Sequence, residues 1–380
     1  MQRSTWIRRL PWSVVLVAAV LVLLGWLGIA RSQELAETSS RYLYRQMAWS
    51  AVCAVVMLLA TWPSYRVLTR WSYAVLGASL LLLIAVYWFP PVNGAQRWIR
   101  FGPVGLQPSE FAKLAVVLGL ARYLMYRESY RNLSGLLVPL AIVLVPVVLV
   151  LREPNLGTAL VFLPVLFVML FAAGARKRHF AVAALAALAV TPLLWSQMSR
   201  EQKSRVTALA EQTRADERPS EDGYQLHQAK QLLALGGWRG SYFGGEVTPD
   251  RTAYYVPEAH TDAIAVVLGE RFGLLGLAAL LSLFLLLVWR TLAVAQATRE
   301  PYGRLVAIGV AALVGTEVLI NTGMLVGLLP ITGLALPLVS YGGSSLLANS
   351  LALGLVLNIG LRPGYEVTNE PFRFAERVAA

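Results

Sequence analysis

The sequence has little charge and almost no cysteine. Only 14% of its 380 residues are Asp, Glu, Lys or Arg, whereas 57% are hydrophobic. Soluble domains carry roughly 25% charged residues, so the composition excludes an ordinary soluble protein and predicts a polytopic membrane protein. The single cysteine, Cys53, lies within an apolar run and has no second cysteine to form an intramolecular disulfide.

Motifs for nucleotide and metal chemistry are also missing. The sequence contains no GxxxxGK[ST] phosphate loop and no HExxH pair, and its three histidines, His179, His227 and His260, are scattered. These absences argue against ATP-driven transport and zinc catalysis. The sequence requires no cofactor, is compatible with a divalent cation, and does not indicate which residues would bind a metal.

The net charge of +12 would suit a nucleic-acid-binding protein. In a membrane protein, basic cytoplasmic loops explain it more simply, with some attraction for anionic membrane lipids. We therefore expect contacts with membrane lipids and no nucleic-acid partner.

Long apolar runs dominate the chain, and a helix needs about 20 apolar residues to cross a bilayer. The basic start "MQRSTWIRRLPW" leads into the first run without a small-residue cleavage site, which predicts a retained span. The sequence predicts an all-α membrane protein with ten transmembrane helices, at 12–30, 46–62, 72–89, 109–126, 136–151, 157–173, 179–195, 273–293, 304–329 and 338–361.

Lys and Arg gather in alternate connections, including the N-terminus and Arg176–Arg178. This bias predicts that both termini are cytoplasmic. We expect a single transmembrane domain over 1–380, with a large extracytoplasmic loop at 196–262 between helices 7 and 8 and a short cytoplasmic tail at 363–380. The second half of the loop is rich in Gly and aromatic residues and too aromatic for disorder, so we expect it to fold over the outer face, with an amphipathic helix near 224–235.

Two charged residues open an otherwise apolar helix. Glu110 and Lys113 are spaced i,i+3, on one helical face, and Ser109 before them is a candidate N-cap. One interpretation is an intramembrane ion pair that fixes helix packing. The other is a lysine that faces a cavity and binds an anion while Glu110 orients it, and the two are compatible.

Asp262 directly precedes another apolar helix. Such an aspartate is most often a helix cap. The alternative is a carboxylate at the membrane surface that takes a proton from a substrate hydroxyl. Farther along, Glu270 and Arg271 are expected to form a structural pair.

Two more stretches carry candidate binding residues. "VNGAQRWIRFGPVGLQPSE" places Arg97 and Arg100 on the outer side, where arginine holds phosphates or snorkels at the interface. "LPLVSYGGSSLLANS" places Ser344 at a helix start, where small residues permit close packing or leave donors facing a cavity.

Several of these stretches together resemble the SEDS family, named for shape, elongation, division and sporulation. They are "NGAQRWIRFGPVGLQPSEFAK", "NLGTAL", "YVPEAHTD" and "NTGMLVGLLPITGLALPLVSYGGSS", in that order, and the resemblance covers roughly 10–362. The last stretch favours a RodA-like over an FtsW-like member.

The resemblance implies a peptidoglycan glycosyltransferase that polymerises lipid II at the outer face of the bacterial cytoplasmic membrane during cell elongation and shape maintenance. It implies that Asp262 is the general base and that a class B penicillin-binding protein, a transpeptidase, is the partner. The family's "SE" and lysine match Ser109, Glu110 and Lys113. We expect Lys113, Arg97 and Arg100 to stabilise the leaving pyrophosphate, and Ser344 to bind substrate.

The chain departs from the family pattern at three positions. Ala263 follows the "HTD" motif where phenylalanine is common, Arg271 replaces the second of two acids, and Asn155 replaces an aspartate. Two other functions remain open: a lipid II flippase, which intramembrane charges would also suit, and a non-catalytic scaffold for the transpeptidase. An ion channel is disfavoured, because the sequence contains no repeated ring of charges.

Overall fold

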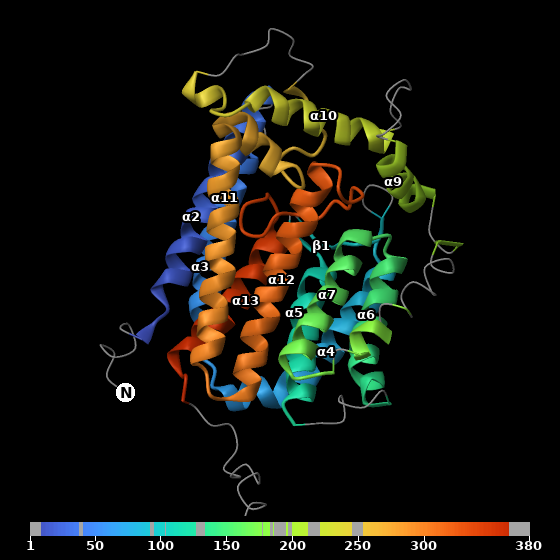
Figure 1. Cartoon of the computed structure of the whole chain (residues 1–380), viewed down its shortest axis with the longest axis vertical. Helices are drawn as coiled ribbons and strands as arrows, with labels where there is room; N and C mark the ends of the chain where they lie inside the picture. Colours follow the sequence, from blue (N-terminus) through green and yellow to red (C-terminus); the bar gives the residue numbers. More distant parts are fainter. Residues whose placement is uncertain are drawn as a thin grey trace, which may run out of the picture.

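The protein forms one helical bundle with further helices lying across its upper end (Figure 1). This computed structural model describes residues 9–37, 41–91, 95–102, 104–126, 134–176, 178–182, 185, 195–196, 200–211, 221–244 and 254–364.

The bundle is built from helices that run along its long axis (Figure 1). They are α2 (Trp12–Leu35), α3 (Tyr42–Leu59), α4 (Tyr65–Ala85), α5 (Pro108–Leu124), α6 (Leu137–Arg152), α7 (Leu156–Ala172), α11 (Ile264–Ala297), α12 (Pro301–Leu325) and α13 (Gly343–Leu361). Within the described residues, α2, α3, α4, α11, α12 and α13 are long and apolar enough to cross a membrane, and α6 and α7 are apolar but shorter. The prediction of an all-helical, multi-span membrane protein is confirmed. The predicted span at 179–195 lies largely outside the described residues.

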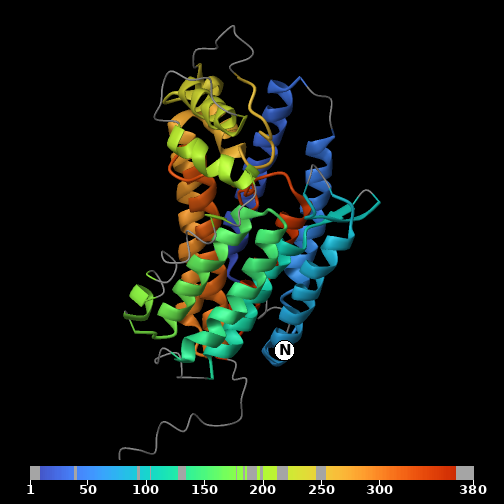
Figure 2. The ribbon, with the colours of Figure 1, turned by 90° about the vertical axis from the view of Figure 1, so that its right-hand side faces the viewer.

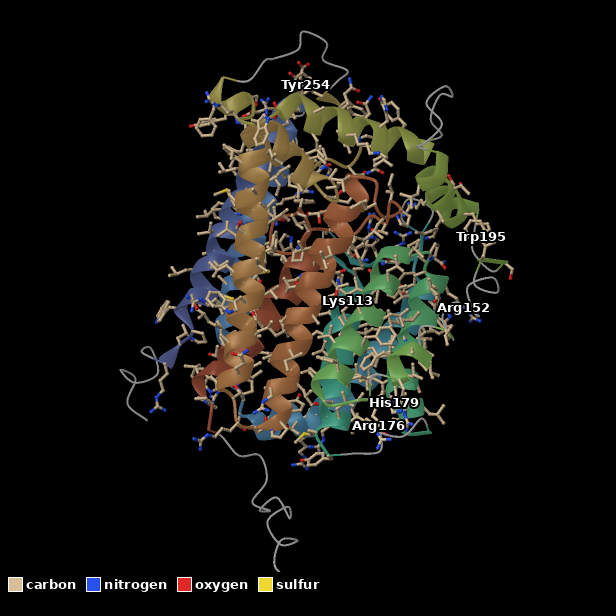
Figure 3. All side chains as sticks on the ribbon, in the orientation of Figure 1. Lys113, Arg152, Arg176, His179, Trp195 and Tyr254 are labelled. Atoms are coloured by element: carbon tan, nitrogen blue, oxygen red, sulfur yellow. The ribbon has the colours of Figure 1, made fainter. Side chains whose placement is uncertain are left out.

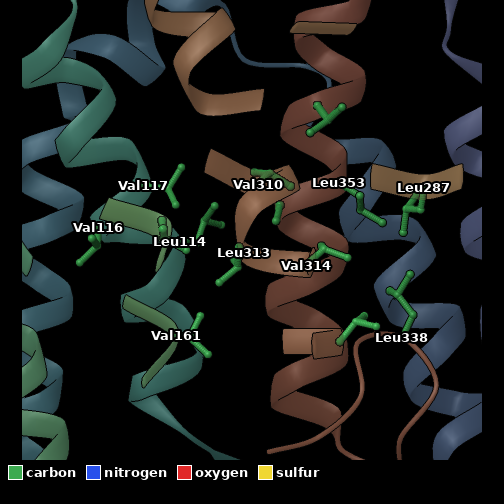
Figure 4. Close-up of a cluster of buried hydrophobic side chains, with 14 of the residues drawn as sticks. Leu114, Val116, Val117, Val161, Leu287, Val310, Leu313, Val314, Leu338 and Leu353 are labelled. Carbon is green, nitrogen blue, oxygen red and sulfur yellow. The ribbon is translucent and has the colours of Figure 1, made fainter. Parts of the chain in front are cut away.

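Apolar side chains point both out of the bundle and into it. Leu285 of α11 and Leu319 of α12 are exposed, as expected for helices that contact lipid tails. Inside, Val117 of α5, Val314 of α12 and Leu353 of α13 belong to a continuous buried core, part of which Figure 4 shows. The bundle thus has a lipid-facing surface and a closely packed centre.

The two ends of the described chain lie at the same end of the bundle. Pro11 precedes α2, and a methyl group built on Gly360 of α13 would lie 2.5 Å from its Cγ. An even number of membrane crossings places the ends on the same side, so this contact agrees with the predicted even count.

The opposite end carries the connections that shape the site. A short antiparallel hairpin joins β1 (Ile99–Phe101) to β2 (Val104–Leu106), with Arg100 opposite Gly105. Helices α9 (Arg200–Glu211) and α10 (Glu221–Gly236) lie across this end (Figures 1 and 2). The amphipathic helix predicted near 224–235 is therefore present as α10, whose Leu226 and Leu232 are buried.

Helix α11 is kinked where the segment after α10 crosses it. Gly273 has a φ of 67°, and a methyl group built there would lie 2.5 Å from the Trp238 carbonyl carbon. The carbonyls of Gly237 and Trp238 accept hydrogen bonds from Leu274 N and Leu275 N, at 2.9 and 3.4 Å. The predicted span began at residue 273, which is the kink; the helix itself begins at Ile264 because its first turns are buried under α10.

Several other predicted boundaries are shifted. The helices predicted to start at 46 and 72 start at Tyr42 and Tyr65, because a helix continues beyond the hydrocarbon into the interface. The last helix starts at Gly343 instead of 338, since residues 337–341 form turns and bends. Hydropathy alone does not locate such ends.

Candidate functional site

Asp262 lies directly before α11 but does not cap it. The N-cap position is Ala263, and no side chain makes a capping hydrogen bond there. Asp262 is 6% exposed, and its carboxylate accepts hydrogen bonds from Gln225 Nε2 and Thr261 Oγ1, both at 3.4 Å. Burial raises the pKa of Asp262 to about 6. A carboxylate that the helix does not use, with a pKa near neutrality, is suited to proton transfer.

A gap beside Gly333 faces both this carboxylate and a cation. Gly333 has a φ of 63°, and a methyl group built on it would lie 3.9 Å from Asp262 Oδ2 and 4.0 Å from Arg205 Nη1. Arg205 comes from α9, far along the chain from both. An acid and a guanidinium thus approach one small gap that a larger residue would fill.

The segment around Asp262 is held by stacked rings. His260 stacks on Tyr42 with ring centroids 4.3 Å apart, and Tyr341 lies against both rings. Burial lowers the pKa of His260, which favours its neutral form. One turn after Tyr42, Gln46 Nε2 donates to Ser340 O at 3.1 Å. These contacts join α3 to the turns before α13 and fix the backbone on one side of Asp262.

Two predicted binding serines are used within the protein. Ser344 Oγ donates to Gly105 O at 3.0 Å and accepts from Gln107 N at 3.1 Å, which ties the hairpin to α13. Ser109 Oγ accepts from Gln107 Nε2 at 3.2 Å and from Asn155 Nδ2 at 3.3 Å. Ser109 is not the N-cap of α5, because that position is Gln107. Both hydroxyls are buried, and a role for either in binding substrate stays a prediction.

Arg97 holds the turn between α6 and α7. Its Nε donates to Glu153 O at 2.9 Å and its Nη2 donates to Pro154 O. The Glu153 side chain is 0% exposed, and its oxygens accept no hydrogen bond from the described residues. Burial raises the pKa of Glu153 to about 8, although the charge of Arg97 opposes the shift. Arg100 is exposed on β1, so the two predicted phosphate ligands have different surroundings.

Lys113 is enclosed by two carboxylates. Its Nζ lies 3.0 Å from Glu110 Oε1 and also contacts Glu317 Oε1 of α12. The lysine side chain is 3% exposed and that of Glu317 is 1% exposed. Lys113 lies near mid-height in the bundle, away from α9 and α10 (Figure 3). Two acids around one ammonium leave no excess positive charge for a phosphate, so this geometry favours the ion-pair interpretation.

Glu270 and Arg271 do not pair with each other. Arg31 of α2 binds Glu270 through both carboxylate oxygens, at 2.8 and 3.0 Å. Arg271 instead lies over the Tyr242 ring, 5.0 Å from its centroid. The predicted pair was wrong because consecutive residues point to different sides of a helix.

The structure therefore gathers some predicted residues and separates others. Asp262 accepts from Gln225 and lies, like Arg205, near Gly333 at the end that carries α9 and α10, whereas Lys113 belongs to a cluster deeper in the bundle. Sequence reasoning missed Arg205, which lies in a polar segment without periodicity. It also missed Glu317, although an ionisable residue inside an apolar helix is a usable signal.

Within the part of the chain that the structure describes, no three His, Cys, Asp or Glu side chains are grouped so that they could hold a metal ion. At the Asp262 site, the Asp262 and Glu258 carboxylates both accept from Thr261 Oγ1, and Gln225 supplies an amide.

Comparison with known proteins places this geometry in a family. The family model described as cell cycle protein, which covers FtsW, RodA and SpoVE, matches residues 8–362. A probable peptidoglycan glycosyltransferase FtsW from Trichlorobacter lovleyi is 35% identical over 324 residues, covering 84% of this chain and 83% of that protein. Peptidoglycan glycosyltransferase MrdB from Escherichia coli K12 is 36% identical over 318 residues, covering 83% and 84%.

Solved structures of similar proteins support the same family assignment. The crystal structure of the Thermus thermophilus rod shape determining protein RodA matches with a TM-score of 0.69 and 30% identity, covering 93% of this chain and 97% of that one. A chain of a peptidoglycan synthase complex, described as coordinating polymerization and crosslinking, matches with a TM-score of 0.77 and 34% identity, covering 92% and 97%. The chain therefore belongs to the SEDS family of peptidoglycan glycosyltransferases, the family of FtsW, RodA and SpoVE.

Proposed function

We propose that this protein polymerises lipid II into glycan strands at the outer face of the cytoplasmic membrane, with Asp262 as the general base. The observation that carries the proposal is the Asp262 carboxylate, which caps no helix and faces the gap that it shares with Arg205. Its pKa of about 6 leaves it largely ionised at neutral pH, yet basic enough to take a proton.

In the proposed reaction, a hydroxyl of the acceptor sugar attacks the anomeric carbon of the donor. A C–O bond forms there while the bond from that carbon to the lipid pyrophosphate breaks. The hydroxyl proton passes to Asp262, and the pyrophosphate leaves with the bonding electron pair. Burial of Asp262 keeps competing water away from the carboxylate.

The leaving pyrophosphate gains negative charge, which a fixed cation stabilises. We assign this role to Arg205, because its guanidinium borders the same gap as the base. Arg97 and Arg100 stay candidates for guiding the substrate from the hairpin side. Lys113 is better assigned to holding α5 against α12 through Glu110 and Glu317.

The proposed setting is a bacterial cytoplasmic membrane with both termini in the cytoplasm. We retain the ten predicted spans, of which the seventh, at 179–195, falls largely outside the described residues. The segment 196–262 then faces the cell exterior, where the lipid-linked sugars are polymerised.

We propose a RodA-like role in elongation and cell shape, with an FtsW-like role in division as the alternative. The partner is a class B penicillin-binding protein that crosslinks the new strand. The similar chain from a peptidoglycan synthase complex supports such an assembly, and the relatives named FtsW and MrdB keep both cellular roles open.

The test is polymerisation of purified lipid II by the protein in complex with its transpeptidase. Asp262→Ala should express and fold but form no glycan product. The matched control is Glu258→Ala, which removes a neighbouring acid whose carboxylate accepts from Thr261 and should stay active. Full activity of Asp262→Ala would remove Asp262 as the base.

The same variants separate the other two functions. A flippase would move fluorescent lipid II across vesicle membranes without forming polymer. A scaffold would tolerate Asp262→Ala and lose activity only when partner binding is disrupted.

A further inference from the structure

The side chain of Asn321 on α12 bridges two segments at the site. Its Nδ2 donates to Asp262 O at 2.8 Å and to Leu334 O at 2.7 Å. We propose that Asn321 is a positioning residue for the reaction: it sets the spacing between Asp262 and the gap at Gly333. This inference rests on the proposed role of Asp262 as the base.

The orientation of the amide follows from its partners. Both are backbone carbonyls, which only accept hydrogen bonds, so the NH2 group must face them. Asn321 is 0% exposed, so water does not compete for these donors. Leu334 directly follows Gly333. The two hydrogen bonds from Asn321 therefore attach the backbone of Asp262 and the segment at Gly333 to the same point on α12.

The position of Asn321 on α12 is itself restrained by neighbouring contacts. Glu317 lies one turn before Asn321 on the same helical face and contacts Lys113 of α5. The ion cluster therefore restrains α12 at the level just below Asn321. A reactive group is held accurately when the residue that supports it has its own support.

Packing alone does not account for an amide at this position. Asn321 Oδ1 is buried and accepts no hydrogen bond from the described residues. A buried acceptor without a partner is unfavourable, and a leucine of similar volume would fill the space without it. The amide therefore serves to donate two hydrogen bonds, one of which goes to the backbone carbonyl of Asp262.

The experiment measures kcat and KM for lipid II polymerisation by the complex with the transpeptidase. Asn321→Leu keeps the volume and removes both donors. Asn321→Gln keeps the amide but places it one methylene group farther from the backbone. Thr322→Val is the matched control, because Thr322 Oγ1 donates only to Val318 O within α12.

We expect Asn321→Leu to lower kcat about tenfold or more, with KM within about threefold. Asn321→Gln should recover part of the rate, and Thr322→Val should match the wild type. If Asn321→Leu fails to fold, Asn321→Gln decides: its kcat must fall while its melting temperature stays near the wild-type value.

The pH profile distinguishes positioning from general damage. A loosened Asp262 gains water, so the acid limb of kcat should move to lower pH by about half a unit or more in the Asn321 variants. Glu258 from the same segment, whose charge acts on Asp262, and Arg205 from α9, which lies near Gly333 as Asp262 does, are unchanged in every variant. Thr322→Val should leave the limb in place.

The inference is overturned if the Asn321 variants keep wild-type kcat, or lose it with an unmoved acid limb. It fails separately from the proposed function. Inactive Asp262→Ala with normal Asn321 variants refutes the positioning role alone, whereas active Asp262→Ala refutes the base.

Discussion

Replacing Lys113 tests whether this lysine holds the bundle or binds substrate. Lys113→Met keeps a long side chain and removes the charge. It leaves Glu110 and Glu317 buried side by side with no cation between them, since both contact the same Nζ. Removing one partner of a buried ion pair costs about 3–5 kcal/mol, because an uncompensated charge stays in the interior.

The second change follows from the same geometry. Glu317→Gln added to Lys113→Met removes one of the two stranded charges, so the double variant should recover about 2 kcal/mol. Lys203→Met on α9 is the control for loss of a lysine. Among the side chains that the structure describes, no carboxylate forms a salt bridge with Lys203, and its replacement should change stability by less than about 0.5 kcal/mol.

The assay is unfolding in detergent micelles, followed by tryptophan fluorescence, alongside polymerisation at one temperature that is the same for every variant and close to the limit of wild-type stability. We expect Lys113→Met to lose stability and activity together. A variant as stable as the wild type that makes no polymer would refute the reasoning, because Lys113 would then act on the substrate.

Two further predictions concern single groups. Burial raises the pKa of Glu153 from 4.5 to about 8, so the folded chain keeps a proton that the unfolded chain releases, and stability falls as pH rises between these values. Glu153→Gln should remove this slope and gain about 1–2 kcal/mol at pH 9, measured by unfolding at pH 5 and 9; equal slopes would contradict it. Gly273→Ala should cost about 1–3 kcal/mol, because a methyl group there meets the Trp238 backbone at 2.5 Å. The control Gly315→Ala has only Val288 Cγ2 nearby, at 3.8 Å, so equal losses would contradict the close approach.

The bundle was predictable because long apolar runs allow few structures in a membrane. The site was less predictable from the sequence, because its contacts join distant parts of the chain. Nothing near Lys113 in the sequence indicates Glu317, which lies 204 positions away. The acceptors of Arg97 are backbone carbonyls, which leave no residue signature.

Whether Asp262 caps α11 is decided by the structure and not by the sequence pattern. An aspartate before an apolar helix is most often a cap, and its position alone leaves a free carboxylate as the alternative. The helix begins one residue later than a cap at Asp262 requires, with Ala263 at the N-cap. That single-residue offset leaves the carboxylate without a capping role, and sequence-based boundaries are not accurate to one residue.

Asn155, a departure from the family pattern, is also explained by its contacts. Its Oδ1 caps α7 by accepting from Thr158 N at 3.3 Å, while its Nδ2 donates to Ser109 Oγ. An ionised aspartate would cap the helix but has no N–H to donate. The amide thus joins α7 to the start of α5 without placing another buried charge there.

The most direct test of Asp262 as the base is the pH dependence of kcat for lipid II polymerisation. We predict that the wild-type rate falls below about pH 6 as one carboxylate takes up a proton, and that Asp262→Asn is inactive at every pH. Wild-type rates from Asp262→Asn, with the same acid limb, would contradict the proposal.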